Sequence, residues 1–180
     1  MWAAPAPYYR EVGIRVLKPG RLVFVSLALA ALLAATGCDR GSHPKQINKP
    51  APDFSISDGA TSIRLANYRG KMVIVNFWES HCGPCIAELP SLLQFHHDHP
   101  EIPILAISSD AGEGDYRSFI VQRHMDLTTV RDPKQTVGDK YGITGWPETF
   151  VIDQNGMIRR RFIGATDWGD PEIERFLRTL

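Results

Sequence analysis

Residues 78–85 read Trp78-Glu79-Ser80-His81-Cys82-Gly83-Pro84-Cys85 and join two segments with different hydrophobic patterns. The segment before them, residues 71–78, is almost continuously apolar and β-branched, which is typical of a strand buried on both faces. The segment after them, residues 84–97, carries apolar residues at a helical period and a proline in its first turn. The sequence therefore predicts that the two cysteines lie where a central strand ends and a helix begins.

Two cysteines separated by two residues can form a disulfide that opens and closes without unfolding the domain. At positions i and i+3 of a helix the Cβ atoms lie about 5–6 Å apart, so a small adjustment lets the sulfurs bond. A loop this short contributes only about 2 kcal/mol to stability. At the helix N-terminus we expect the pKa of Cys82 to fall below the ~8.5 of a free cysteine. Cys85, one turn inside the helix, is expected to be the resolving thiol.

The alternative interpretations of the cysteine pair are a metal site and an inert pair. A structural zinc site needs four ligands, usually from two such pairs, and the only further cysteine is Cys38. His81 and the histidines at residues 96–99 offer imidazoles, but histidines near a helix end are more often capping or solvated residues. The sequence predicts no metal site, and no cofactor besides the Cys82–Cys85 disulfide itself.

The composition is that of one globular domain with a short additional segment. The chain has 180 residues, 43% of them hydrophobic and 22% charged, and Lys plus Arg equals Asp plus Glu at 20 each. These values exclude a polytopic membrane protein, a collagen-like chain and wholesale disorder. A neutral chain also lacks the basic surface of a nucleic-acid-binding protein, so we expect no nucleic-acid partner.

The N-terminal segment has the pattern of an export signal. Residues 22–37 carry no charge, and four basic residues precede them against one glutamate. This pattern predicts a secretory signal over residues 1–37, or an uncleaved membrane anchor. Ala35-Thr36-Gly37-Cys38 resembles the bacterial lipobox, which implies lipidation of Cys38 and attachment to a membrane. Residues 38–52 are rich in Gly, Ser, Pro and polar residues, which predicts a flexible tether.

Residues 53–180 alternate between strand and helix patterns, which predicts an α/β domain. A hairpin with an Asp58-Gly59 turn opens this domain, and a second hairpin with an Asn155-Gly156 turn lies near its end. Pro90 predicts a kink in the first helix, and Asp170 before Pro171 predicts the start of the last helix. The other predicted elements are a strand at 103–108 and helices at 114–124 and 133–141.

The CxxC segment resembles the active site of the thioredoxin superfamily, in which a tryptophan and two cysteines hold this spacing. Pro50-Ala51-Pro52-Asp53-Phe54 and Asn76-Phe77-Trp78 are similar to the TlpA/ResA-like thiol-disulfide oxidoreductases, and the resemblance covers residues 47–180. It implies a thioredoxin fold, with a central mixed sheet flanked by helices and an N-terminal β-hairpin extension. It also implies that Pro147 is a cis-proline facing the disulfide, where the backbone pairs with a substrate peptide.

The resemblance also assigns roles to residues around the cysteines. Glu88, one turn after Cys85, matches a carboxylate that serves proton transfer in this family, and its alternative is a solvated surface glutamate. Asn76 stands where cytoplasmic thioredoxins place a buried aspartate. The expected substrate-binding residues are Trp78, His81, Trp146 and Pro147.

Three residues depart from the common pattern of the superfamily. His81 and Trp146 stand where tryptophan and smaller residues respectively are common, and Glu148 adds a negative charge beside Pro147. A cationic imidazole at His81 stabilises a neighbouring thiolate. The run Arg159-Arg160-Arg161 is expected to be a solvated strand edge.

Together these patterns predict an exported, membrane-tethered thiol-disulfide oxidoreductase that reduces protein disulfides through Cys82 and Cys85. The expected partners are protein disulfides and a thiol electron donor in the membrane. We expect a monomer in the bacterial cell envelope, tethered to the inner membrane and facing the periplasm. Two alternatives stay open: a thiol peroxidase, since peroxiredoxins share the fold, and a copper-binding chaperone that uses the CxxC as soft ligands.

Overall fold

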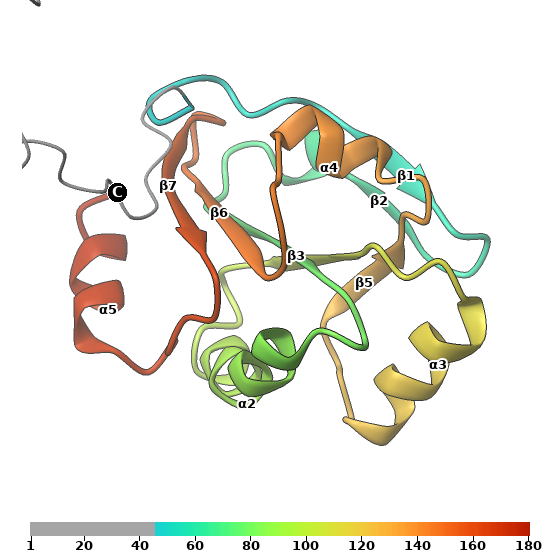
Figure 1. Ribbon diagram of the computed structural model, residues 1–180. Coiled ribbons are helices and arrows are strands. Elements are labelled where there is room, and N and C mark those ends of the chain that lie inside the picture. Colours follow the sequence, from blue (N-terminus) through green and yellow to red (C-terminus); the bar gives the residue numbers. More distant parts are fainter. Residues whose placement is uncertain (1–45) are drawn as a thin grey trace, which may run out of the picture. The chain divides into compact units, whose positions relative to one another are not determined.

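The computed structural model describes residues 46–180 (Figure 1). The predicted signal or anchor at residues 1–37, the lipidation site Cys38 and the first part of the predicted tether lie outside the described residues. None of the helices between residues 46 and 180 is both long enough and apolar enough to cross a membrane. The elements are, in chain order, β1 (Ser55–Ser57), β2 (Ser62–Arg64), the 3-10 helix η1 (Leu65–Tyr68), β3 (Val73–Trp78), α2 (Gly83–Asp98), β4 (Ile104–Ser108), α3 (Glu113–Gln122), β5 (Thr128–Arg131), α4 (Thr136–Tyr141), β6 (Glu148–Ile152), β7 (Ile158–Ile163) and α5 (Pro171–Leu177).

A five-stranded mixed sheet lies at the centre of the domain, with the strand order β5-β4-β3-β6-β7. β3 runs parallel to β4 and antiparallel to β6, which confirms the predicted mixed α/β architecture. All residues of β3 are buried, as the apolar run predicts for a strand covered on both faces. β1 and β2 form a separate antiparallel hairpin, so the predicted N-terminal extension is confirmed as well.

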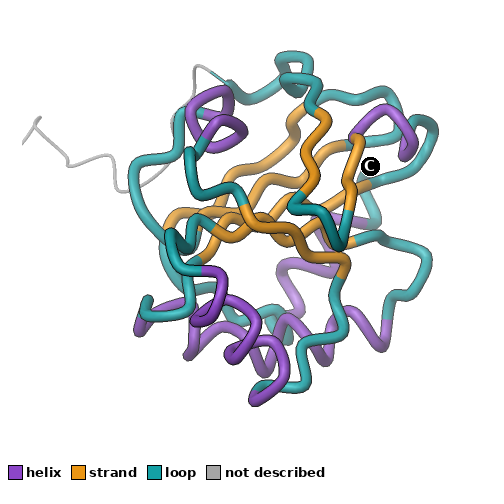
Figure 2. Tube along the Cα trace, turned by 90° about the vertical axis from the view of Figure 1, so that its right-hand side faces the viewer, coloured by secondary structure: helices purple, strands orange, loops and turns teal. Residues whose placement is uncertain are grey.

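Helices cover both faces of this sheet (Figure 2). Successive side chains of β3 point to opposite faces of the sheet, so every second residue lies on the same face. Ile74 and Trp78 pack in one core with α2, α3 and α5. Val75 and Phe77 pack in the other core with α4 and the β1–β2 hairpin. Asn76 therefore lies on the α2 face, where it is buried.

Local sequence signals mark several element boundaries correctly. α2 begins directly after Cys82, has Pro84 in its first turn and continues through Pro90. The Asp170 side chain accepts a hydrogen bond from Glu172 N (2.9 Å) at the start of α5, as a capping aspartate does. Gly156 has a φ of 78° in the β6–β7 turn, a conformation that glycine adopts readily.

The edge strand β5 is not among the elements that the sequence predicts. It pairs in parallel with β4 and is four residues long, with two threonines and an arginine. Only Thr129 and Val130 are buried, so the segment shows neither a clear alternation nor an apolar run. Asp58 accepts a hydrogen bond from Arg131 N (3.2 Å), which joins the first hairpin to this edge of the sheet.

Residues 46–52 are attached to the domain and do not belong to a free tether. Asn48 N donates to Ile158 O (2.8 Å), and Ile158 N donates to Lys49 O (2.9 Å), so this segment pairs with the start of β7. Gln46 Nε2 donates to Tyr141 O (2.7 Å). The prediction of a tether over residues 38–52 is therefore wrong for its second part, because backbone groups of that part find partners in a distant strand.

Candidate active site

The two cysteines of the CxxC motif form a disulfide at the start of α2. Their Cα atoms lie 5.2 Å apart, and Cys85 N donates a hydrogen bond to Cys82 Sγ (3.1 Å). Cys82 is the N-cap of α2, so its sulfur lies beside N–H groups that have no partner within the helix. Cys82 is half-buried, whereas Cys85 is only 6% exposed. A reactant arriving from solvent therefore meets the sulfur of Cys82 first.

The loop after β4 connects the end of β3 to the loop before β6. Ser109 N donates to Trp78 O (2.9 Å), and Trp146 Nε1 donates to Ser109 Oγ (2.9 Å). The Trp78 ring itself packs against Phe119, with 5.0 Å between the ring centroids, and is 3% exposed. The structure thus brings Trp146 to the end of β3, while Trp78, which the resemblance implied as a substrate contact, is a core residue of the α2 face.

Pro147 lies beside the end of β3, at the same end of the sheet as the CxxC. Glu148 pairs with Phe77 in the antiparallel ladder between β6 and β3, so the residue before it lies next to the last residue of β3. The Trp146–Pro147 peptide bond is cis, as the resemblance implied. Pro147 and Cys82 therefore lie at the same end of the sheet although they are 65 positions apart in the sequence.

A buried carboxylate organises the loop that leads to Cys82. Asp110 is buried, and its oxygens accept hydrogen bonds from Ser80 N (3.1 Å), Ser80 Oγ (2.6 Å) and Ser108 Oγ (2.6 Å). Because the Ser80 hydroxyl donates its proton to Asp110, its oxygen is left to accept from His81 Nδ1 (3.0 Å). This hydrogen-bond pattern assigns a proton to Nδ1 of His81 and orients the exposed imidazole directly before Cys82.

Glu88 is buried on the inner face of α2, one turn after Cys85. Its Oε1 accepts from Trp168 Nε1 (2.9 Å) and Thr166 N (3.3 Å), and its Oε2 accepts from Asn76 Nδ2 (3.5 Å). Burial raises the pKa of Glu88 to about 7, although these three hydrogen bonds to the carboxylate oppose the shift. The alternative of a solvated surface glutamate is excluded by its 3% exposure.

Glu88 and Cys85 line the same small internal void. The void has a volume of about 10 Å³ and is also lined by Asn76 and Trp78. A space of this size holds about one water molecule and no organic ligand. Glu88 and Cys85 therefore border the same space, and both residues are almost fully buried.

The negative charge of Glu148, beside Pro147, has a cationic partner. Glu148 is buried at the start of β6, and Arg161 Nε of β7 donates to its Oε2 (2.8 Å), with Nη2 on the same oxygen. The sequence interpretation of Arg161 as part of a solvated edge is wrong, since this side chain is buried as well. A charge run in a sequence does not reveal which of its members faces inward, and only the pairing of β6 with β7 brings these two residues together.

Comparison with known proteins identifies the family of this chain. The pattern of the AhpC/TSA family matches residues 47–161. The thiol-disulfide oxidoreductase ResA from Bacillus thuringiensis (strain Al Hakam) is 30% identical over 173 residues, which cover 91% of this chain and 99% of the relative. The chain belongs to the AhpC/TSA family. ResA from Geobacillus thermodenitrificans is 31% identical over 157 residues, which cover 82% of this chain and 90% of the relative. These relatives confirm the ResA-like resemblance. This AhpC/TSA-family chain is a thiol-disulfide oxidoreductase.

Solved structures with similar function descriptions share the fold of this AhpC/TSA-family chain. A protein from Chlorobium tepidum described as thiol:disulfide interchange protein DsbE has a TM-score of 0.68 at 28% identity, covering 74% of this chain and 96% of its own. The thioredoxin domain of a thiol-disulfide oxidoreductase from Bacteroides vulgatus has a TM-score of 0.64 at 26% identity, covering 72% and 96% respectively. The predicted thioredoxin fold is therefore confirmed.

One group of residues beside the CxxC of this AhpC/TSA-family chain has the composition of a metal site. Glu79, His81 and Asp110 each offer one ligand atom, and these atoms lie within 4.8 Å of one another. The Asp110 oxygens already accept hydrogen bonds from Ser80 and Ser108, however. The donor set therefore fits a hydrogen-bonded loop better than a metal centre.

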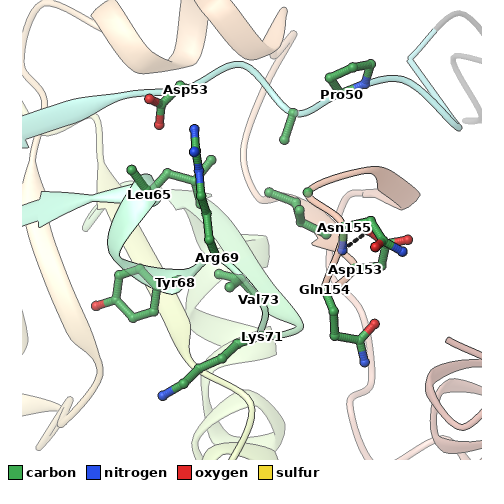
Figure 3. Close-up of a pocket in the computed structure, with 14 residues that line it drawn as sticks. Pro50, Asp53, Leu65, Tyr68, Arg69, Lys71, Val73, Asp153, Gln154 and Asn155 are labelled. Atoms are coloured by element: carbon green, nitrogen blue, oxygen red, sulfur yellow. Dashed lines mark hydrogen bonds between the residues drawn. The ribbon is translucent and has the colours of Figure 1, made fainter.

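A larger cavity lies at the start of β3 (Figure 3). It has a volume of about 370 Å³ and is lined by Arg69, Val73 at the start of β3, and Asp153 in the β6–β7 turn, among others. The CxxC follows the other end of β3. This cavity is therefore separate from the residues that surround the disulfide.

Proposed function

We propose that the chain reduces disulfide bonds of other proteins, with Cys82 as the nucleophile and Cys85 as the resolving thiol. The observation that carries this assignment is the difference between a half-buried Cys82 and a Cys85 that is 6% exposed. The position of Cys82 as N-cap of α2 supports it, because unpaired N–H groups and the helix dipole favour a thiolate there.

In this reaction the Cys82 thiolate attacks one sulfur of the substrate disulfide and displaces the other as a thiolate, which leaves a mixed disulfide. The Cys85 thiolate then attacks Cys82 Sγ, and the second substrate thiolate leaves. The substrate gains two electrons and, on protonation, two protons, and the cysteine pair becomes the disulfide of this structure. A thiol electron donor regenerates the dithiol by the reverse exchange, without a further cofactor.

Proton transfer with Cys85 is the role that we assign to Glu88. Cys85 is buried, so its proton has to leave through the protein before the thiolate can attack. Glu88 lines the same void as Cys85, and its pKa of about 7 lets it take up and release a proton near neutral pH.

The substrate peptide is expected to pair with the backbone of Trp146. Within residues 46–180 neither the N–H nor the C=O of Trp146 has a hydrogen-bond partner, whereas Pro147 O accepts from Gly164 N (2.9 Å). An extended substrate segment can therefore form two backbone hydrogen bonds at Trp146, in the manner of an added strand. The Trp146 indole is held by its hydrogen bond to Ser109, and we expect it to contact the bound substrate segment. His81, which directly precedes Cys82, is exposed and is expected to contact the substrate as well.

The activity is proposed to take place outside the cytoplasm, at the inner membrane. The uncharged run at residues 22–37 and the lipobox-like Ala35-Thr36-Gly37-Cys38 support export and lipidation of Cys38. Mass spectrometry of the membrane fraction tests this: acylated Cys38 at the mature N-terminus is the expected result. An unmodified Cys38 within an intact N-terminus contradicts it.

Trapping of the mixed disulfide tests the proposed reaction. The Cys85→Ser variant of the whole chain is expected to accumulate proteins linked to Cys82, which are released by dithiothreitol. Cys82→Ser is the matched control, since it also replaces one sulfur by oxygen, and it is expected to trap none. If Cys85→Ser captures no protein while the unchanged chain consumes hydrogen peroxide, the thiol peroxidase is the better assignment.

A further inference from the structure

Within residues 46–180, every hydrogen-bond donor to the Glu88 carboxylate is electrically neutral. The donors are the indole N–H of Trp168 (2.9 Å), the backbone N–H of Thr166 (3.3 Å) and the amide of Asn76 (3.5 Å). The two shorter bonds both end on Oε1, and both come from the loop between β7 and α5. This loop lies 78 to 80 positions from Glu88 in the sequence.

The loop that carries these two donors is fastened to α2. Ser91 Oγ, one turn after Glu88, accepts from Trp168 N (3.2 Å) and lies 3.4 Å from Thr166 O. The Trp168 ring packs against Phe95, with 5.3 Å between the ring centroids, and against Phe162 at 5.5 Å. Trp168 is 2% exposed, so its indole N–H has a fixed direction toward the carboxylate.

We propose that Trp168 is a positioning residue of the redox site, which holds the Glu88 carboxylate in one orientation and sets the pH at which it exchanges its proton. Trp168 acts through Glu88 and does not touch the sulfurs. The proposal rests on the proton-transfer role proposed for Glu88.

The physical reason is the balance between burial and hydrogen bonding. Burial favours the uncharged carboxylic acid, and each donor that points at the carboxylate favours the ion. Among the described residues no charged side chain contributes to the pKa of Glu88. The titratable group that faces Glu88 is Cys85 across the void, and Asp167 in the donor loop is exposed and accepts from Gly169 N (3.0 Å). The indole N–H of Trp168 is therefore the strongest single interaction that keeps Glu88 able to ionise near neutral pH.

The Trp168→Phe variant of the whole chain tests the proposal, because it keeps an aromatic ring in place and removes the N–H. Carbon-13 NMR of the carboxylates in the oxidised protein, where the cysteines do not titrate, reports the protonation midpoint of Glu88. Assignment of the signal follows from its loss in Glu88→Gln. The midpoint is expected to rise by about one pH unit, since a hydrogen bond to an ion is lost.

The matched control is Trp146→Phe, which loses an indole N–H that bonds Ser109 instead. Its Glu88 midpoint is expected to stay at the value of the unchanged chain. An unchanged midpoint in Trp168→Phe overturns the proposal. If Trp168→Phe does not fold, Ser91→Ala, which loosens the same loop, is expected to raise the midpoint by less, and no change there overturns the proposal too.

The rate of disulfide reduction separates this proposal from the function on which it rests. The pH profile of the rate in Trp168→Phe is expected to shift upward with the Glu88 midpoint. If the midpoint shifts but neither Trp168→Phe nor Glu88→Gln changes the profile, the proton-transfer role of Glu88 and the effect of Trp168 on the reaction both fail, while the disulfide exchange through Cys82 stands.

Discussion

Glu88 and Glu148 are the buried glutamates of residues 46–180, and their surroundings differ in one respect. Glu148 has the guanidinium of Arg161 as a partner, and also accepts from Thr144 N (2.7 Å) and Thr144 Oγ1 (2.8 Å). Glu88 accepts hydrogen bonds from neutral groups alone. Two carboxylates that are both buried can therefore have different partners: Glu148 has a cation beside it, and Glu88 has neutral donors.

The two sets of partners suit different tasks. Arg161 also donates to Gln46 Oε1 (2.9 Å) and to Gly142 O (2.9 Å), so the Glu148–Arg161 pair joins the loop before Pro147 to β7 and to the N-terminal segment. That arrangement keeps the cis-proline loop in place. Glu88 borders the same void as Cys85, and the role proposed for it is proton transfer, which a permanently paired charge would hinder.

The largest loss of stability is expected when Arg161, the cationic partner of Glu148, is replaced. Arg161→Met leaves the charge of Glu148 buried without its partner, which is expected to lower the free energy of unfolding by about 3–5 kcal/mol. Urea denaturation of the oxidised protein at neutral pH measures this loss. The double variant Arg161→Met/Glu148→Gln is expected to recover part of it, because no buried charge remains.

The neighbouring arginine is the control for this prediction. The Arg160 guanidinium stacks on Phe162 at 4.7 Å from the ring centroid and has no carboxylate partner in the described chain. Arg160→Met is expected to cost about 1 kcal/mol. Equal losses for the two variants contradict the view that the charge pair, and not the arginine side chain as such, holds Glu148.

The second effect is a pH dependence of stability that belongs to Glu88. Its pKa is about 7 in the folded protein against 4.5 for an ordinary glutamate, so the folded state binds the extra proton between these values. The contribution of Glu88 to stability is therefore fully present below pH 4.5 and is lost as the pH rises to 7, by about 3 kcal/mol. Glu88→Gln removes that slope, and the difference between the two stability curves isolates it from other titrations. A difference that stays constant with pH contradicts an elevated pKa.

The smallest loss of stability is expected when Glu148 loses one of its neutral hydrogen-bond donors, the hydroxyl of Thr144. Thr144→Val keeps the shape of the side chain and removes the hydroxyl that donates to Glu148 Oε1. The guanidinium and Thr144 N remain, so the expected loss is about 1 kcal/mol in the same denaturation experiment. A loss as large as that of Arg161→Met shows that hydrogen bonds, and not the cation, dominate around Glu148.

The elements that the sequence predicts well are those whose signals lie within a few residues. The buried strand before Trp78, the helix start at Cys82 and the turn at Asn155-Gly156 follow from local composition. The sequence does not predict β5 or the pairing of residues 46–52, because the partners of these two segments lie far away in the sequence. Each forms only because its backbone pairs with a strand elsewhere in the chain, and neither has enough apolar residues to show it.

The contacts of the site also fall into those between residues close in the sequence, which could be predicted, and those between distant residues, which could not. Cys82 and Cys85 are three positions apart, and Glu88 is three positions further along the same helix, so helix geometry brings them together. The contacts of Ser80 with Asp110, of Glu148 with Arg161 and of Glu88 with Trp168 span 30, 13 and 80 positions respectively. No sequence pattern within reach of these residues indicates such pairings.

The sequence by itself determined the reactive group of this protein, because a disulfide between residues three apart needs only the start of one helix. The order of its strand and helix patterns predicted an α/β domain, and the resemblance of the CxxC segment to the thioredoxin superfamily implied the thioredoxin fold. The tertiary structure decided the electrostatic surroundings of the disulfide. Whether a carboxylate is buried, which donors reach it and whether a cation lies beside it depend on segments that meet only when the sheet is assembled. Glu88 and Glu148 are the same type of residue in the sequence, and packing raises the pKa of the first and makes the second half of an ion pair.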